Sequence, residues 1–380
     1  MPTRRQTLLS VLTAALWQVL PRSAHAADKP FASFNSAFGA KIAVPFLMQL
    51  EAATATLVTA AAALKKQPDA ATFAAVLQGF NAVSDAWAAV QLLRFGPLSQ
   101  EQRLDRLAYW PERGNVTEKQ MAAFLSTADK GKLAPAGFAK ASVAIQGLSA
   151  LERLLYDGEK TADNKPVSDK ALAELTAQTP AAAYRAAMIA AIAGNLQQIA
   201  KEGRKAWHDL SAKLAKGDQA GLAASPQEAT NQIYAGLVTE IQLIGGQKIG
   251  IPLGKSADAA KPRQTEQWRS GRSLQDITLN IAALRQALLG DPAGSVIALV
   301  SADAAGDMRS KLTTALDACV QAIPTVTQPL DIAVTDDKAG RPEVQALLVK
   351  INQLRDVLTN DLPKAAGITL GFNDLDGDSG

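Results

Sequence analysis

Cysteine and histidine are scarce in this sequence, with one cysteine and two histidines in 380 residues. A lone thiol cannot form an intrachain disulfide, and the alignment of Cys319 with Leu316 on an apolar helical stripe predicts a small buried core residue. His25 falls within the expected export signal described below, which leaves His208 alone in the rest of the chain. With a single histidine, metal sites built mainly from imidazole are excluded. The usual Ser-His-Asp triad is also excluded unless His208 is its histidine. Its charged neighbours predict a solvated or capping role for His208.

Residues 1–26 have the features of a cleaved export signal. They combine Arg4 and Arg5 with an apolar run at 8–20 and a small-x-small cleavage pattern at 24–26. The run, about 13 residues long, is shorter than the ~20 that a membrane-spanning helix needs. We therefore expect a periplasmic protein, exported either by the twin-arginine route, whose signal TRRQTLL resembles, or by general secretion.

Neither sign of charge is in excess in the remaining chain. Residues 1–26 contain three arginines and no acid, so 36 basic residues face 36 acidic ones after cleavage. This balance gives no support for nucleic acid or an anionic membrane as a partner. The sequence has no later run of 18 apolar residues and no cysteine at the cleavage site, so we expect a soluble product without a membrane anchor.

Alternation of apolar and polar residues with a period of two is nearly absent, whereas the helical period of 3.6 dominates and alanine is abundant. We therefore predict an all-α fold. At about 354 residues the processed chain exceeds one typical core. The connector KGDQAGLAASPQE predicts two packed, four-helix-bundle-like lobes, at 27–220 and 221–380. The predicted helices cover residues 33–66, 69–95, 137–157, 169–215, 226–244, 266–289, 304–323 and 342–359.

The stretch GLSALERLLYDGE, residues 147–159, places polar groups beside a buried face. Leu148, Leu151 and Leu155 follow the spacing of one apolar helical stripe. Ser149 and Glu152 repeat that spacing one residue on, about 100° around the helix. Their hydroxyl and carboxylate therefore border a surface that must be buried and need partners.

A second set of polar groups lies on the helix predicted at 266–289. Ser270, Ser273 and Asn280 share a face with apolar residues. Buried hydroxyls and amides must be hydrogen-bonded, so these residues either tie two helices together or contact a ligand.

Two irregular segments, at 94–115 and 245–273, interrupt the predicted helices, and long loops in compact domains are often functional. Near the end of the second segment, Arg269 and Arg272 lie one turn apart at the expected start of a helix, where free N–H groups add to an anion-attracting field. The alternative is a pair of solvated arginines.

The C-terminal stretch GITLGFNDLDGDSG alternates acids at 374, 376 and 378 beside Asn373. Alternating carboxylates suit a hard cation, although the calcium-loop pattern is not met because Gly377 comes too early. The tail is either frayed or folds back to complete a site.

Five stretches, taken together, resemble the imelysin-like family of exported bacterial helical proteins. In chain order they are FGP at 95–97, YWPERGN at 109–115, GLSALERLLY at 147–156, PLGKS and RSGRSL within 252–274, and GFNDLDGD at 371–378. The resemblance implies two packed helical bundles with a site between them, and an association with iron regulation and iron uptake. The family is classed as metallopeptidase-like by a Gly-x-His-x-x-Glu motif.

That motif falls on Gly147, Ser149 and Glu152, so a serine stands where the family carries histidine. Serine is a poor zinc ligand compared with imidazole, which disfavours a zinc peptidase site. Glu152 can still act as an oxygen ligand or as a partner for an arginine.

From these features we predict a binding or accessory protein in metal or iron handling, which holds a small ligand or metal ion and works with partner proteins of an iron-uptake system. The cofactor, if any, would be a divalent metal or iron, with Glu152 and Asp376 as its ligands. The predicted ligand-binding residues are Ser149, Glu152, Arg94, Arg103, Arg106, Trp110, Ser270, Arg272, Ser273, Asn280 and Asn373. The alternatives are a metallohydrolase that uses Glu152 with acids such as Asp376, and a structural role in which these residues bridge the lobes.

Overall fold

The computed structural model describes residues 29–112, 114–215 and 223–370. The predicted export signal at 1–26, the predicted lobe boundary near residue 220, and the tail residues Asn373 and Asp376 therefore lie outside the described residues.

Helices account for the regular structure of the described residues, whose only β-type feature is one isolated bridge between Lys160 and Pro166. The prediction of an all-α fold is confirmed. The longer helices are α1 (Lys29–Phe38), α2 (Val44–Lys66), α3 (Ala70–Val90), α5 (Val116–Thr127), α9 (Pro180–Leu214), α10 (Pro226–Leu243), α12 (Ser273–Arg285), α13 (Ala302–Ala322) and α15 (Gly340–Asp356). Shorter ones are α4 (Arg103–Leu107), α6 (Pro135–Phe138), α7 (Leu148–Leu155), α8 (Asp169–Thr176), α11 (Ile251–Leu253), α14 (Leu330–Ala333) and α16 (Leu362–Ala366).

Local sequence explains where several helices begin. Asp69 and Thr72 form a reciprocal capping box at the start of α3. Thr179 caps α9 and Ser225 caps α10, and each is followed by a proline at the first helical position. A proline there loses no hydrogen bond, because that N–H has no partner in the helix.

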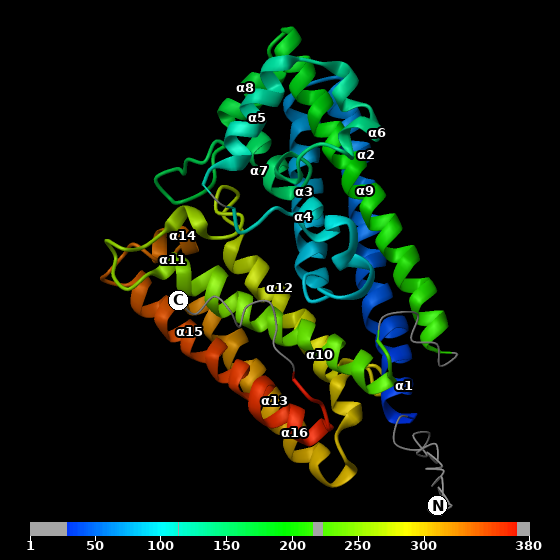
Figure 1. The fold of residues 1–380 in the computed structure, drawn as a ribbon. Coiled ribbons are helices and arrows are strands. Elements are labelled where there is room, and N and C mark those ends of the chain that lie inside the picture. The colour runs from blue at the N-terminus through cyan, green and yellow to red at the C-terminus, as the bar shows by residue number, and fades with distance from the viewer. Residues whose placement is uncertain (1–28, 113, 216–222, 371–380) are drawn as a thin grey trace, which may run out of the picture.

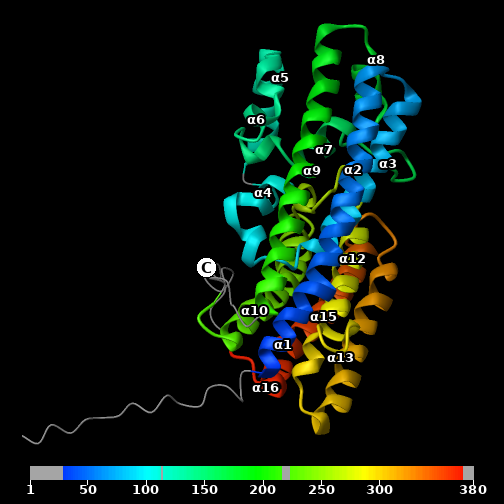
Figure 2. The same ribbon diagram turned by 90° about the vertical axis from the view of Figure 1, so that its right-hand side faces the viewer.

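The helices form two sets that share one core. In the first set α2 packs against α3 and α9, and in the second α13 packs on α15 while α10 and α12 lie alongside (Figure 1). Helix α1 continues into α2 through a π-helical turn and lies against α10, so it joins the two sets (Figure 2). Asn35 of α1 donates to the carbonyl of Pro226 at 2.8 Å and accepts from the Thr230 hydroxyl at 2.7 Å. A continuous cluster of buried apolar side chains runs through both sets.

Three helix predictions are wrong in their extent. The predicted helix at 137–157 is reduced to α7, because Gly147 takes an extended conformation before it. The helix at 169–215 is two helices, α8 and α9, because the sequence Thr179-Pro180 provides a cap and a residue without an N–H. The helix at 266–289 starts only at Ser273, after a turn in which Gly271 has φ +70°.

The segment predicted to be irregular at 245–273 is partly helical. A π-helical turn, η5 (Ile244–Gly250), extends α10, and α11 follows it directly. By contrast, the prediction of a buried core position for Cys319 is confirmed, since its side chain is 0% exposed.

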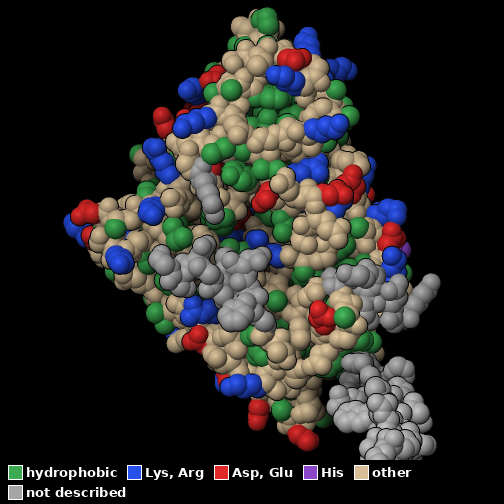
Figure 3. Space-filling model, in the orientation of Figure 1, with side chains coloured by type: hydrophobic (Ala, Val, Ile, Leu, Met, Phe, Trp, Pro, Cys, Tyr) green, Lys and Arg blue, Asp and Glu red, His purple; other side chains and the backbone are tan. Residues whose placement is uncertain are grey.

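One helix of the described residues, Pro30–Lys66, is long and apolar enough to cross a membrane by length and composition alone. Its residues Leu47, Leu50 and Leu57 are fully buried in the core, and core helices of this kind pass the same criterion. On the outer surface, side chains of both charge signs are interspersed over the face drawn in Figure 3.

Candidate functional site

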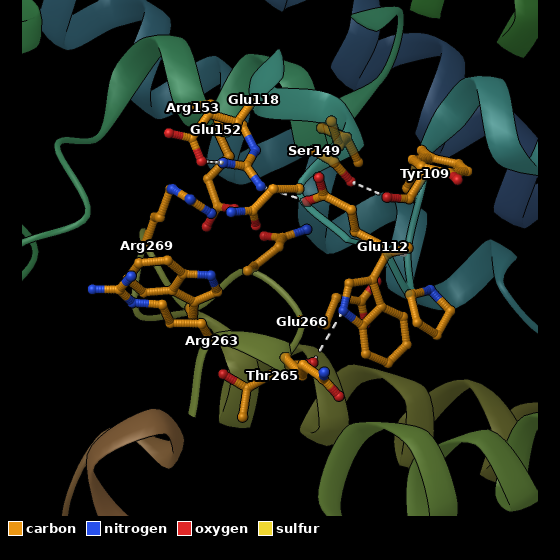
Figure 4. Close-up of a pocket in the computed structure, with 18 of the residues that line it drawn as sticks. Tyr109, Glu112, Glu118, Ser149, Glu152, Arg153, Arg263, Thr265, Glu266 and Arg269 are labelled. Atoms are coloured by element: carbon orange, nitrogen blue, oxygen red, sulfur yellow. Dashed lines mark hydrogen bonds and ion pairs between the residues drawn. The ribbon is translucent and has the colours of Figure 1, made fainter. Parts of the chain in front are cut away.

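A pocket of about 280 Å³ lies where α7 meets segments from both halves of the chain. One wall is formed by residues 108–112, 114, 115 and 118 together with α7, and the other by residues 263–269, which precede α12 (Figure 4). Four glutamates line it, namely Glu112, Glu118, Glu152 and Glu266, together with Arg153, Arg263 and Arg269 and with the aromatic residues Tyr109, Trp110 and Trp268. Charged groups of both signs and two indole rings therefore surround one small space.

Gly147 permits this arrangement by letting α7 start against the end of α4. A Cβ atom at Gly147 would lie 2.5 Å from the carbonyl oxygen of Leu107 and 2.7 Å from that of Arg106. Such contacts are too short for any side chain, so glycine is required here by close backbone approach. The approach sets the position of Ser149 and Glu152, which follow within the next turn and a half.

Ser149 has a partner on its own wall of the pocket, whereas Glu152 has one on the opposite side. The half-buried Ser149 hydroxyl donates to the carbonyl oxygen of Tyr109 at 3.1 Å. The buried Glu152 accepts two hydrogen bonds at Oε1 from Ser270, one from its backbone N–H at 2.8 Å and one from its hydroxyl at 2.7 Å. The structure therefore joins Ser149, Glu152, Trp110 and Ser270 around one site, although Ser270 lies in a turn and not on a helix.

The surroundings of Glu152 change the pKa values of two groups. Burial raises the pKa of the Glu152 carboxyl, and the two bonds from Ser270 oppose that change because they favour the ionised form. Burial and the nearby Glu152 together raise the pKa of Tyr156 to about 12.

Below the pocket a fully buried lysine connects the two sets of helices. Lys248 extends from the π-helical turn η5, and its Nζ lies 2.6 Å from Glu266 Oε2, Gln91 Oε1 and Asn280 Oδ1. Gln91 also donates to Glu266 Oε1 at 2.8 Å. The ammonium thus donates to two amide oxygens and forms an ion pair with one carboxylate, so the buried charge is compensated. Its Nζ also lies 6.0 Å from the ring centroid of Trp110, at the edge of the pocket.

Two further buried carboxylates flank this lysine. Both carboxylate oxygens of Asp276 and both of Glu240 are buried and accept no hydrogen bond. Asp276 lies 3.5 Å from Arg272, and Glu240 lies 3.7 Å from Arg94. Burial raises the pKa of each, and the neighbouring charge of Glu266 raises both further.

All four arginines predicted to bind ligand make other contacts. Arg94 and Arg272 make the ion pairs just described, and Arg272 also pairs with Asp85. Arg103 pairs with Glu101 at 2.8 Å and donates to the carbonyl of Pro97, while Arg106 donates to Gln146 at 3.0 Å and to Asn195 at 3.2 Å. None of these four lines the pocket. Ser273 donates to the backbone carbonyl of Glu266, and Asn280 belongs to the lysine network.

The residues that line the pocket do not fit a resident zinc ion. Within the described ranges, no group of three or more His, Cys, Asp or Glu side chains is placed to hold a metal. The motif position that would supply imidazole is Ser149, and Glu152 Oε1 is occupied by Ser270. Asp376, the other predicted ligand, lies outside the described residues.

The family of the chain follows from a comparison with family models. The model of the imelysin family, peptidase M75, matches residues 43–358, which cover both sets of helices. This chain belongs to the imelysin family. No curated protein matches it.

Solved imelysin-like structures share the fold of this imelysin. An imelysin-like protein from Psychrobacter arcticum 273-4 has a TM-score of 0.71 at 18% identity, covering 91% of this chain and 98% of that one. A protein described as an iron-regulated protein A precursor, from Parabacteroides distasonis ATCC 8503, has a TM-score of 0.65 at 15% identity, covering 87% and 96%. At these identities the similarity establishes the fold alone.

Sequence reasoning missed several pocket and network residues of this imelysin, above all Lys248, Glu266 and Arg153. One signal was available for Lys248, which is the only charged residue between Glu240 and Lys255 and lies in an otherwise apolar and glycine-rich stretch. The others gave no local signal, because their partners come from distant parts of the chain.

Proposed function

We propose that this imelysin is an exported, periplasmic binding protein that takes part in iron or metal handling by holding a small ligand in the pocket beside α7. The observation that supports it is the pocket itself, in which the family motif positions Ser149 and Glu152 lie together with arginines and tryptophans from both halves of the chain. The structural neighbour described as iron-regulated agrees with such a role.

The structure favours binding over hydrolysis. A hydrolase needs a nucleophile or an activated water placed beside a base. The donor set at Ser149 and Glu152 does not fit the zinc that would activate such a water, as described above. We therefore assign Glu152 the task of fixing Ser270, and with it the wall that carries Arg269, in the binding position.

The test begins with the protein purified from its own periplasm. Native mass spectrometry and elemental analysis should detect a bound ligand or metal in the wild type, and the amount should fall in Glu152→Ala. Glu159→Ala, an exposed acid a few residues away, is the matched control and should retain the ligand. The experiment is done on cells grown with low and with high iron. The proposal is overturned if the wild-type protein carries neither ligand nor metal under both conditions.

A further inference from the structure

Two guanidinium groups of the pocket differ in what they bind. Arg153 on α7 pairs with Glu112, and its Nη1 lies 3.9 Å from Glu118. Arg269, from the opposite wall, stacks on Trp268, with its guanidinium carbon 4.2 Å from the ring centroid. Among the described residues Arg269 makes no hydrogen bond or ion pair. Figure 4 shows it at the side of the pocket, near Arg153 and Arg263.

Stacking leaves the recognition edge of Arg269 available. Contact with the indole uses the flat face of the guanidinium, whereas its N–H groups point outward in the plane. Those N–H groups form a fork that matches the two oxygens of a carboxylate. The guanidinium carbon of the exposed Arg263 lies 5.7 Å from the ring centroid of the same indole, so Arg263 adds a second positive charge near it.

Three of the four carboxylates of the pocket, by contrast, already have donors, whereas the exposed Glu118 only lies 3.9 Å from Arg153. Glu266 is bound by Lys248 and Gln91, and Glu112 accepts from Arg153 and from the backbone N–H of Thr117 at 2.8 Å. Glu152 Oε1 accepts twice from Ser270. At Glu112, Glu152 and Glu266 a bare cation would have to compete with these donors, whereas an anion would find Arg269 unpaired.

Arg269 is also held in an unfavourable electrostatic environment. Burial and the like charge of Arg153 lower the pKa of Arg269 to about 10, and the opposing effect of the negative charges of Glu152, Glu112 and Glu118 is smaller. A negative group that entered between the two guanidiniums would offset both effects. The position beside Arg269 therefore favours an anionic group over a cationic one.

We propose that the ligand of this pocket is an organic polycarboxylate whose carboxylate pairs with Arg269, so that a metal ion reaches the site as a negatively charged carboxylate complex. This inference rests on the proposed function and names its ligand class. Trp110 and Trp268 form apolar walls on which the carbon skeleton of such a ligand lies.

Isothermal titration calorimetry with three probes tests the inference: ferric citrate, citrate alone, and ferrous ion under anaerobic conditions without an organic anion. We expect the wild type to bind ferric citrate, and Arg269→Ala to weaken that binding at least about 10-fold, the effect of losing a hydrogen bond to a charged group. Arg269→Lys keeps the positive charge but loses the forked pair of N–H donors, so its affinity for ferric citrate should lie between those of the wild type and Arg269→Ala. Arg309→Ala removes an exposed arginine of α13 and should leave the affinity unchanged.

The three probes show whether the pocket binds the metal–carboxylate complex, the carboxylate alone or the metal ion alone. Binding of ferric citrate alone supports the metal complex, and equal Arg269-dependent binding of both citrate probes supports the polycarboxylate but overturns its link to metal. Binding of ferrous ion that Arg269→Ala leaves unchanged overturns the inference while supporting metal handling. If no probe binds, the inference fails, and the proposed function is decided separately by the ligand content of the protein from its periplasm.

Discussion

Lys248→Met should be among the most destabilising single substitutions in this imelysin. The side chain of Lys248 is 2% exposed, and its ammonium contacts the 4% exposed Glu266 as well as two amide oxygens. Methionine keeps a similar shape but leaves the Glu266 carboxylate buried with Gln91 as its remaining donor. Removing one partner of a buried ion pair costs roughly 3–5 kcal/mol, and we expect a loss of this size in the free energy of unfolding.

Urea denaturation followed by circular dichroism measures this loss. The control is Lys201→Met, at an exposed lysine of α9, which should change stability by less than about 0.5 kcal/mol. In the double variant with Glu266→Gln the uncompensated charge is absent, so at least about 1 kcal/mol should be recovered as coupling between the two sites. The reasoning is refuted if Lys248→Met behaves like Lys201→Met, or if the double variant recovers nothing.

Three further predictions concern the site and its support. Gly147→Ala forces a methyl group against a backbone carbonyl and should lower the free energy of unfolding by about 1–3 kcal/mol. The control is Gly194→Ala, which has nothing within 4 Å of its Cβ and should stabilise α9 by up to about 1 kcal/mol. Equal urea midpoints for the two variants would contradict this prediction. Ser270→Ala removes a hydroxyl donor from buried Glu152 and should lower stability by about 1–3 kcal/mol in thermal unfolding, and an unchanged midpoint would show that this bond contributes nothing. The raised pKa of Asp276 means that the folded state binds this proton more tightly than the unfolded state, so the contribution of Asp276 to stability should decrease as pH rises above roughly 4. The difference in stability between the wild type and Asp276→Asn should change with pH in that direction; parallel pH curves would exclude the assignment.

The helical class was predictable because helix formation depends on neighbours a few residues apart. The caps at Asp69, Thr179 and Ser225 and the apolar period of 3.6 are all local signals. The errors in extent also have local causes, which the apolar period obscured. It continues through residues 142–147 and 177–180, although α7 begins only after the backbone contact at Gly147 and α9 begins only after the cap at Thr179.

The candidate site was predictable only in part. The spacing of Ser149 and Glu152 showed that their polar groups border a buried face, and the same argument applied to Ser270, Ser273 and Asn280. The arginines were more difficult, because an arginine in a loop has the same local pattern whether it faces a pocket or pairs with an acid. Arg94 and Arg103 form ion pairs, whereas Arg269, noted in the sequence only for its place before a helix, faces the pocket.

The sequence by itself determined that this chain is helical, where several helices begin, that Cys319 is buried, and that Glu152 needs a partner. Only the tertiary structure decided which partner that is. Ser270 lies 118 residues from Glu152, and Gln91 lies 157 residues from Lys248. The physical reason is that local periodicity sets which face of a helix is buried, whereas the packing of distant helices sets which side chains meet across that face.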